Sequence, residues 1–425
     1  MAYVPVAFIL AGMAAYTVLA GADFGAGLWS LLTVGPLGGP TEGPDRQRIR
    51  DQARHAMGPV WEANHVWLIF VLVVCWTAYP VAFGSITSTL AAPLLIAAIG
   101  IIFRGAAYAL RGVADSSRAA ENLFAVSSVL TPFALGTMVG AIATGRVPVG
   151  NAAGNLVTSW LNPASVLTGV LAVAFSGYLA AVFLAADSVR YAEADLAAAF
   201  RRRALAAAAL SGALAVAGLL VMRRSGLDLT HGAALVLVCL SAAGGLATLA
   251  LCWRSSFALA RVTAALAVAA VVAGWAAAQA PRFLPGMTVT QAAAGRSTLI
   301  ALIIAVACGA IILIPSLGLL FILFLRGRLD TPESHAAGEG VLDTAGEGEL
   351  DTAGEGELVP TVAAARPSRV TVRARGWGAA AVAGLVAGAG LLVFADAAWA
   401  HALGVACLVL CGVSAFALTA APPDR

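Results

Sequence analysis

Eleven apolar stretches, each close to the ~20 residues that cross a ~30 Å hydrocarbon core as a helix, divide this chain. They are predicted at 4–26, 60–83, 86–110, 121–144, 159–186, 203–222, 232–253, 257–280, 298–325, 377–395 and 399–419. Inside a bilayer each segment has to satisfy its own backbone hydrogen bonds, which a helix does. Because 60% of the residues are hydrophobic and only 11% are charged, the predicted fold class is an all-α polytopic membrane protein.

The basic residues, all of them arginine, fall unevenly on the two sides of the predicted spans. Of the 25, alternate loops place twenty on one side and only five on the other, namely Arg146, Arg223, Arg224, Arg282 and Arg296. Loops rich in positive charge stay in the cytoplasm, so we expect the N-terminus outside and the C-terminus in the cytoplasm. The formal net charge of +3 is too small to indicate a nucleic-acid partner.

A different composition follows the ninth stretch. Three copies of one octad, "AGEGVLDT", "AGEGELDT" and "AGEGELVP", occupy residues 337 to 360 and are rich in Gly and Glu. Such a segment buries too little apolar surface to offset its ordering entropy, so residues 327–376 are predicted to form a disordered cytoplasmic linker. A regulatory tail is the alternative. Residues 377–425 then hold two additional helices to which we assign no role.

Asp23 follows twenty-two uncharged residues, close to the inner end of the first predicted helix. A charge in hydrocarbon costs a few kcal/mol at least, and the negative end of the helix dipole disfavours an anion. The carboxylate is therefore expected to need a compensating cation or proton. A surface acid at the membrane interface is the alternative.

The string "GPVWEANHVW", residues 58 to 67, brings an acid, an amide and an imidazole to the start of the second predicted helix. Glu62 and His65 are three residues apart and share a helix face, with Asn64 beside them. Trp61 and Trp67 have the usual character of interfacial anchors. A proline and an acid in a first helical turn are also ordinary features of a helix start, which is a structural alternative for Glu62.

Arg104 closes an uncharged run of eighteen residues. Snorkelling toward the cytoplasm would explain it. However, the end of the first helix, the start of the second and the end of the third all lie on the same side of the membrane. The topology therefore brings four polar residues to one membrane level, namely Asp23, Glu62, His65 and Arg104. Such a group suits a proton entry path or an ion-pair cluster. No zinc spacing, phosphate-binding loop or nucleophile motif appears in the sequence, and no catalytic residue or metal ligand is predicted.

Four blocks resemble subunit II of the cytochrome bd-type quinol oxidases in order and spacing. They are "GADFGAGL" (21 to 28), "GPVWEANHVWLI" (58 to 69), "FRGAAYALRG" (103 to 112) and "LNPASVLTGV" (161 to 170), and the resemblance covers residues 1 to 326. It implies two four-helix transmembrane bundles, at 1–150 and 151–326, with the ninth span as a peripheral helix in the second range. It also implies a multi-pass protein of the bacterial inner or plasma membrane.

The resemblance further implies a partner, a haem-bearing subunit I, and a complex that oxidises membrane quinol and reduces oxygen to water. Haems b and d are expected on subunit I and none on this chain, while a quinone or lipid molecule and a small accessory subunit are compatible additions. Glu62 matches the acid of the family's proton path, and Asp23 matches the family's acid at the end of the first helix. We expect His65 in the same path, supported by Trp61, Asn64, Trp67 and Arg104.

Two other functions stay open at this point. One is a proton-coupled secondary transporter, because repeated bundles with buried acids at one level also fit that class. The weak sequence similarity between "AYTVLAGAD" and "GYLAAVFLAAD" indicates an internal duplication, which fits either an oxidase subunit or a transporter. The other is an assembly scaffold in which Glu62 has no role in proton transfer.

Overall fold

The computed structural model describes residues 1–32, 48–49, 52, 61–109 and 118–325, together with the single positions 383, 399, 403 and 407. The chain divides into two compact units, Met1–Asp330 and Thr331–Arg425. The predicted linker at 327–376 lies outside the described residues, and so do the two helices predicted within 377–425, apart from the four single helical positions.

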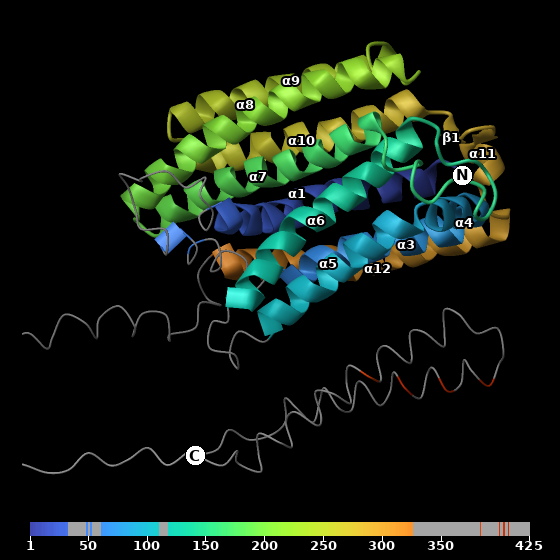
Figure 1. The fold of residues 1–425 in the computed structure, drawn as a ribbon, viewed down its shortest axis with the longest axis horizontal. Coiled ribbons are helices and arrows are strands. Elements are labelled where there is room, and N and C mark those ends of the chain that lie inside the picture. The colour runs from blue at the N-terminus through green and yellow to red at the C-terminus, as the bar shows by residue number, and fades with distance from the viewer. Residues whose placement is uncertain are drawn as a thin grey trace, which may run out of the picture. The chain divides into compact units, whose positions relative to one another are not determined.

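The first unit is a layered array of long helices that run alongside one another (Figure 1). Its helices are α1 (Val4–Leu32), α3 (Trp61–Ala78), α4 (Pro80–Thr89), α5 (Ala91–Ala109), α6 (Arg118–Ala143), α7 (Pro163–Arg190), α8 (Ala194–Arg224), α9 (Gly232–Trp253), α10 (Phe257–Gln279), α11 (Val289–Ala292) and α12 (Arg296–Leu325). A short antiparallel hairpin of β1 (Arg282–Leu284) and β2 (Met287–Thr288) precedes α11.

Seven described helices are long and apolar enough to cross a membrane, and the bent pair of α4 and α5 makes an eighth candidate. The apolar part of α3, Asn64–Ala78, is a shorter helix of the same character. Each of the nine apolar stretches predicted before residue 326 therefore has a helical counterpart. The prediction of an all-α polytopic membrane protein is confirmed.

The predicted end of the second span, in the range 60–83, is wrong. Helix α3 stops at Ala78, and a new helix begins at Pro80 after Tyr79, whose backbone leaves the helical region at φ −138° and ψ 60°. Proline has a fixed φ and no N–H, which suits the first position of a helix and disfavours helical geometry in the residue before it. The apolar run continues through this point, so hydropathy alone did not reveal the break.

The third predicted span, 86–110, is likewise interrupted. Helices α4 and α5 meet at Leu90 with a bend of 81°. Pro93 in the first turn of α5 cannot donate to the carbonyl of Thr89, and its ring crowds that carbonyl, so the helix cannot run through straight. Helix α4 consequently lies across the end of the array where the N-terminus, β1 and α11 are found (Figure 1).

Helix α1 is longer than predicted. It was expected at 4–26 and instead continues to Leu32, because "FGAGLWSLL" contains no helix-breaking proline. Asp23 therefore lies well inside α1 rather than at its end. The expected conflict with the helix dipole is weakened, since that effect falls off within the last turn.

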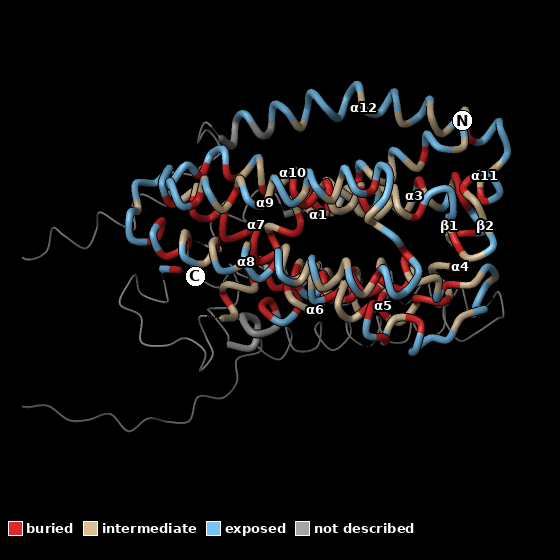
Figure 2. The backbone as a smooth tube through the Cα atoms, turned by 90° about the horizontal axis from the view of Figure 1, so that it is seen from above, coloured by how far each residue is buried: buried red, intermediate tan, exposed pale blue. Residues whose placement is uncertain are grey.

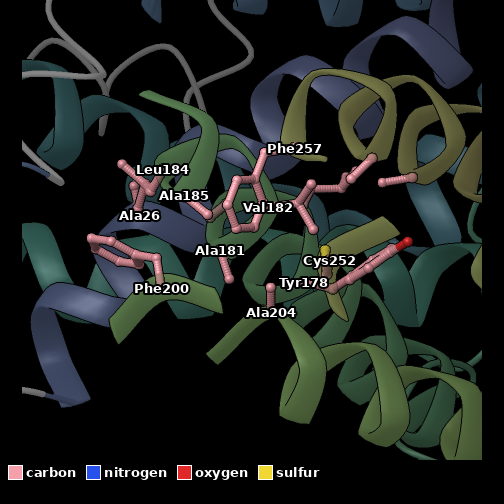
Figure 3. Packing of buried hydrophobic residues seen from close by; sticks show 14 of the residues in the cluster. Ala26, Tyr178, Ala181, Val182, Leu184, Ala185, Phe200, Ala204, Cys252 and Phe257 are labelled. Carbon is pink, nitrogen blue, oxygen red and sulfur yellow. The ribbon is translucent and has the colours of Figure 1, made fainter. Parts of the chain in front are cut away.

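Helix α7 is the centre of the packing and touches α1, α6, α8 and α10. Small residues allow this close approach: a Cβ added to Gly25 of α1 would lie 1.8 Å from the carbonyl oxygen of Ser176 in α7. In lipid such backbone-to-backbone packing drives helix association. Side chains of α7, α8 and α10, among them Tyr178, Phe200 and Phe257, fill the main core cluster (Figure 3).

Helix α12 lies at the edge of this unit, against α3 and, less extensively, α1 (Figure 2). Its isoleucines point outward; Ile311 and Ile312 are 74% and 73% exposed. The predicted division into two bundles at residue 150 stays a prediction, because α1 and α6 both pack on α7 and residues 1–330 form one compact unit.

Candidate functional site

Arg104 of α5 and Asp23 of α1 form a buried ion pair. The Arg104 Nη2 atom lies 2.7 Å from Asp23 Oδ1, and the two side chains are 3% and 4% exposed. The same Nη2 donates to the backbone carbonyl of Asp23 at 2.8 Å. The second guanidinium nitrogen, Nη1, donates to the hydroxyl of Ser128 in α6, which in turn donates to the Phe124 carbonyl at 2.6 Å. One guanidinium thus ties three helices together.

Aromatic rings and a glycine shape the space around this guanidinium. Its central carbon lies 5.0 Å from the ring centroid of Phe24 and 4.4 Å from that of Phe124, within the range of cation–π attraction. A Cβ on Gly27 would lie 2.1 Å from Ser128 Oγ and 3.1 Å from Arg104 Nη1. The bare glycine therefore leaves the room that the arginine and the serine occupy.

Arg104 does not snorkel toward the cytoplasm. It is 2% exposed and turns inward to Asp23, so the snorkelling alternative is wrong for this residue. Moving two charges out of water carries a desolvation cost of several kcal/mol per ion, which the pair offsets only with good geometry and further hydrogen bonds. Arg104 has these bonds, whereas Asp23 Oδ2 is buried and has no hydrogen-bond partner among the described residues.

His65 of α3 packs beside the ion pair between two rings of α1. The centroids of His65 and Tyr16 are 6.0 Å apart, as are those of His65 and Phe24, both in edge-to-face geometry. Asn64 is buried, and its side-chain amide makes a long hydrogen bond of 3.4 Å to the Leu19 carbonyl. Two polar residues of the "WEANHVW" string are thereby directed at α1 rather than at lipid.

The remaining predicted residues of that string have different positions. Trp61 and Glu62 occupy the first turn of α3, as expected, and their side chains lie outside what the structure describes. Trp67 is half-buried and packs on the cluster of Tyr16, Ala20 and Phe24. It serves as packing within the protein and is not a freely exposed anchor.

Sequence reasoning did not single out Tyr16, Ser128 and Phe124. Their uncharged side chains carry no signal in an apolar segment, although Tyr16 lies seven residues before Asp23 and therefore on the same face of α1.

A second ion pair of similar design joins α10 to α7. Arg261 of α10 donates to the carboxylate of Asp187 in α7 and, at 2.8 Å, to the carbonyl of Phe183. The two side chains are 25% and 22% exposed, so this pair is less buried than the first. Asp187 is the last residue of "GYLAAVFLAAD", the stretch whose sequence is similar to the stretch that ends at Asp23.

The described residues do not fit haem ligation. Among them, the two histidines are His65, enclosed by the rings of α1, and His231, exposed and 2.9 Å from Asp228 at the start of α9. They do not face one another. The described part of the chain also contains no group of three His, Cys, Asp or Glu that could hold a metal ion.

With this geometry established, comparison with known proteins decides the family. A sequence model of the family described as cytochrome bd terminal oxidase subunit II matches residues 1–324. The chain belongs to this family. The resemblance predicted for residues 1 to 326 is thus confirmed, and the chain is a multi-span membrane protein of the bd oxidase type.

Two relatives extend this result. The chain is 28% identical over 122 residues to the "cytochrome bd ubiquinol oxidase subunit 2" of Bacillus subtilis (strain 168), a match that covers 27% of this chain and 36% of that protein. It therefore spans about a third of that curated relative's length. The fold is similar to a chain in the structure of bd oxidase from Geobacillus thermodenitrificans, with a TM-score of 0.63 and 23% identity, covering 76% of this chain and 98% of that one.

Proposed function

We propose that this chain is the haem-poor subunit II of a terminal oxidase that oxidises membrane quinol and reduces oxygen to water. The main support for this proposal is that the chain belongs to the subunit II family. The Bacillus subtilis relative is named as a ubiquinol oxidase subunit, which supports the quinol class of substrate. Haems b and d supply the oxygen-reducing centre when bound, and we assign them to a partner subunit I, since the described residues here offer no facing pair of histidines.

The contribution of this chain is to deliver protons from the cytoplasm. Electrons come from quinol, so the protons that complete water have to reach the oxygen-reducing centre separately. Glu62 at the start of α3 would take up a proton near the membrane surface, and Asp23 and His65 lie where the path would continue. Arg104 holds Asp23 in position from α5, at 2.7 Å. The proposed N-out orientation puts this cluster on the cytoplasmic side.

The experiment that tests this role is substitution of Glu62 in the assembled oxidase. Glu62→Gln removes the proton-carrying group while keeping size and polarity, so oxygen consumption should fall by about 10-fold or more with haem content unchanged. Glu62→Asp keeps the carboxyl and should retain most of the turnover. An unchanged rate in Glu62→Gln would favour the scaffold role.

A proton-coupled transporter is the second candidate, favoured by the two Asp–Arg pairs that join α1 to α5 and α7 to α10. A transporter would act alone in proteoliposomes and move a solute in response to a proton gradient. A subunit of an oxidase would be inactive there without its partner.

A further inference from the structure

Two oxygen atoms on one face of α1 are buried without a hydrogen-bond partner among the described residues: the hydroxyl of Tyr16 and Oδ2 of Asp23. Tyr16 is 8% exposed and Asp23 is 6% exposed. An unsatisfied buried polar atom costs about 1–3 kcal/mol, and native proteins rarely leave one unexplained. Two of them on the same helix face call for a shared partner.

The Tyr16 ring lies close to the ring of Phe24, the residue that follows Asp23. Phe24 is eight residues from Tyr16, which corresponds to roughly 12 Å of helix rise, yet their ring centroids are only 6.5 Å apart. The rings must therefore bend toward each other along α1. Asp23 and Arg104 are the charged groups close to Tyr16. The His65 ring lies 6.0 Å from the Tyr16 ring, centroid to centroid, on the side facing α3.

We propose that α1, α3 and α5 enclose a water site that joins the Tyr16 hydroxyl to Asp23 Oδ2, and that Tyr16 positions this water for proton transfer. Buried water typically makes two to four hydrogen bonds to such groups. The inference rests on the proposed proton-delivery function and names the next group on the path. Water accepts the phenol's hydrogen bond and donates to the carboxylate. When a proton has reached Asp23, the water turns to accept it from the carboxyl group and gives one of its own protons to the next water or carboxylate toward the membrane interior. Asp23 is then ionised again, and the Tyr16 hydroxyl keeps its proton.

The chain offers a matched control for this hydroxyl. Tyr178 of α7 is 3% exposed, in the stretch that echoes the one containing Tyr16. Its hydroxyl is likewise buried without a hydrogen-bond partner among the described residues, and no carboxylate is among the groups near it. Removing the Tyr178 hydroxyl changes the protein in the same way without touching the proposed water site.

The test uses the purified oxidase containing this chain with Tyr16→Phe, Tyr178→Phe or Glu62→Gln. Oxygen uptake per haem is measured against pH and in heavy water. Tyr16→Phe should lower turnover by about 10-fold, with a loss that grows as pH rises and protons become scarce, and with a larger solvent isotope effect. Tyr178→Phe should match the parent in all three measurements. A merely structural role of Tyr16 would change neither the pH profile nor the isotope effect.

The outcomes separate this inference from the proposed function. Parental turnover and isotope effect in Tyr16→Phe, with a slow Glu62→Gln, would overturn the water site and leave proton delivery standing. Parental rates in Glu62→Gln as well would overturn both. If Tyr16→Phe fails to assemble, a high-resolution cryo-EM map of the parent oxidase decides. Water density within hydrogen-bond distance of both the Tyr16 hydroxyl and Asp23 Oδ2 supports the site. The absence of such density, in a map that shows ordered water elsewhere, overturns it.

Discussion

Arg104 and Asp23, 81 positions apart in the sequence, meet inside the helix array with Nη2 2.7 Å from Oδ1. Neither side chain is more than 4% exposed. Arg104 also donates to acceptors of α1 and α6, whereas the Asp23 carboxylate is held by Arg104. The pair therefore cannot be opened from one side without leaving a bare charge in an apolar interior.

Replacement of Arg104 by methionine should therefore be strongly destabilising. Breaking a buried pair costs about 3–5 kcal/mol, because the remaining charge is uncompensated. We expect Arg104→Met to lower the apparent Tm of the detergent-purified complex and its haem content per cell. Arg261→Met removes the corresponding arginine of the less buried Asp187 pair and should have a clearly smaller effect. Equal losses in the two variants would contradict the importance assigned to burial.

Gly27→Ala tests the space that the glycine leaves for the arginine. The new methyl group would lie 2.1 Å from Ser128 Oγ, so Ser128 has to move away from Arg104. Overpacking of this kind costs about 1–3 kcal/mol. Gly245→Ala in α9, where nothing lies within 4 Å of the added Cβ, is the matched control and should be neutral or slightly stabilising. Thermal unfolding of both variants checks the difference.

Part of the cluster around Arg104 could be predicted from the sequence. Charges in apolar segments are costly, so Asp23 and Arg104 stood out, and alternation of helix ends placed them at one level. The close contacts with Ser128 and Phe124 did not follow, because they depend on the rotation of α6, which an uncharged sequence does not specify. The breaks at Tyr79 and Leu90 had a local signal in Pro80 and Pro93, hidden within continuous hydropathy.

The hydrogen bond from Trp29 to α7 gives a further prediction. Trp29 Nε1 donates to the Gly177 carbonyl at 2.8 Å and links α1 to α7. Trp29→Phe should destabilise the complex by about 0.5–1.5 kcal/mol for the lost bond, in addition to lost packing. Trp253→Phe removes an indole that is 70% exposed and should change little. A thermal shift no larger for Trp29→Phe than for Trp253→Phe would refute this assignment.

The arginine distribution predicts which turns face the cell exterior. An epitope inserted at Gly226, between α8 and α9, should be accessible to antibody in spheroplasts with an intact membrane. The same epitope at Ser255, between α9 and α10, should become accessible only after permeabilisation. The reverse pattern would place the N-terminus in the cytoplasm and the Asp23 cluster on the wrong side for proton uptake.

The most direct test of the central claim is affinity purification of this chain from its native membrane, followed by an optical haem spectrum and quinol-dependent oxygen uptake. A subunit II should bring with it a haem protein with a red-shifted d-type band and quinol oxidase activity. Purification of an intact chain without any haem partner, or one that moves a solute by itself in proteoliposomes, would contradict the account.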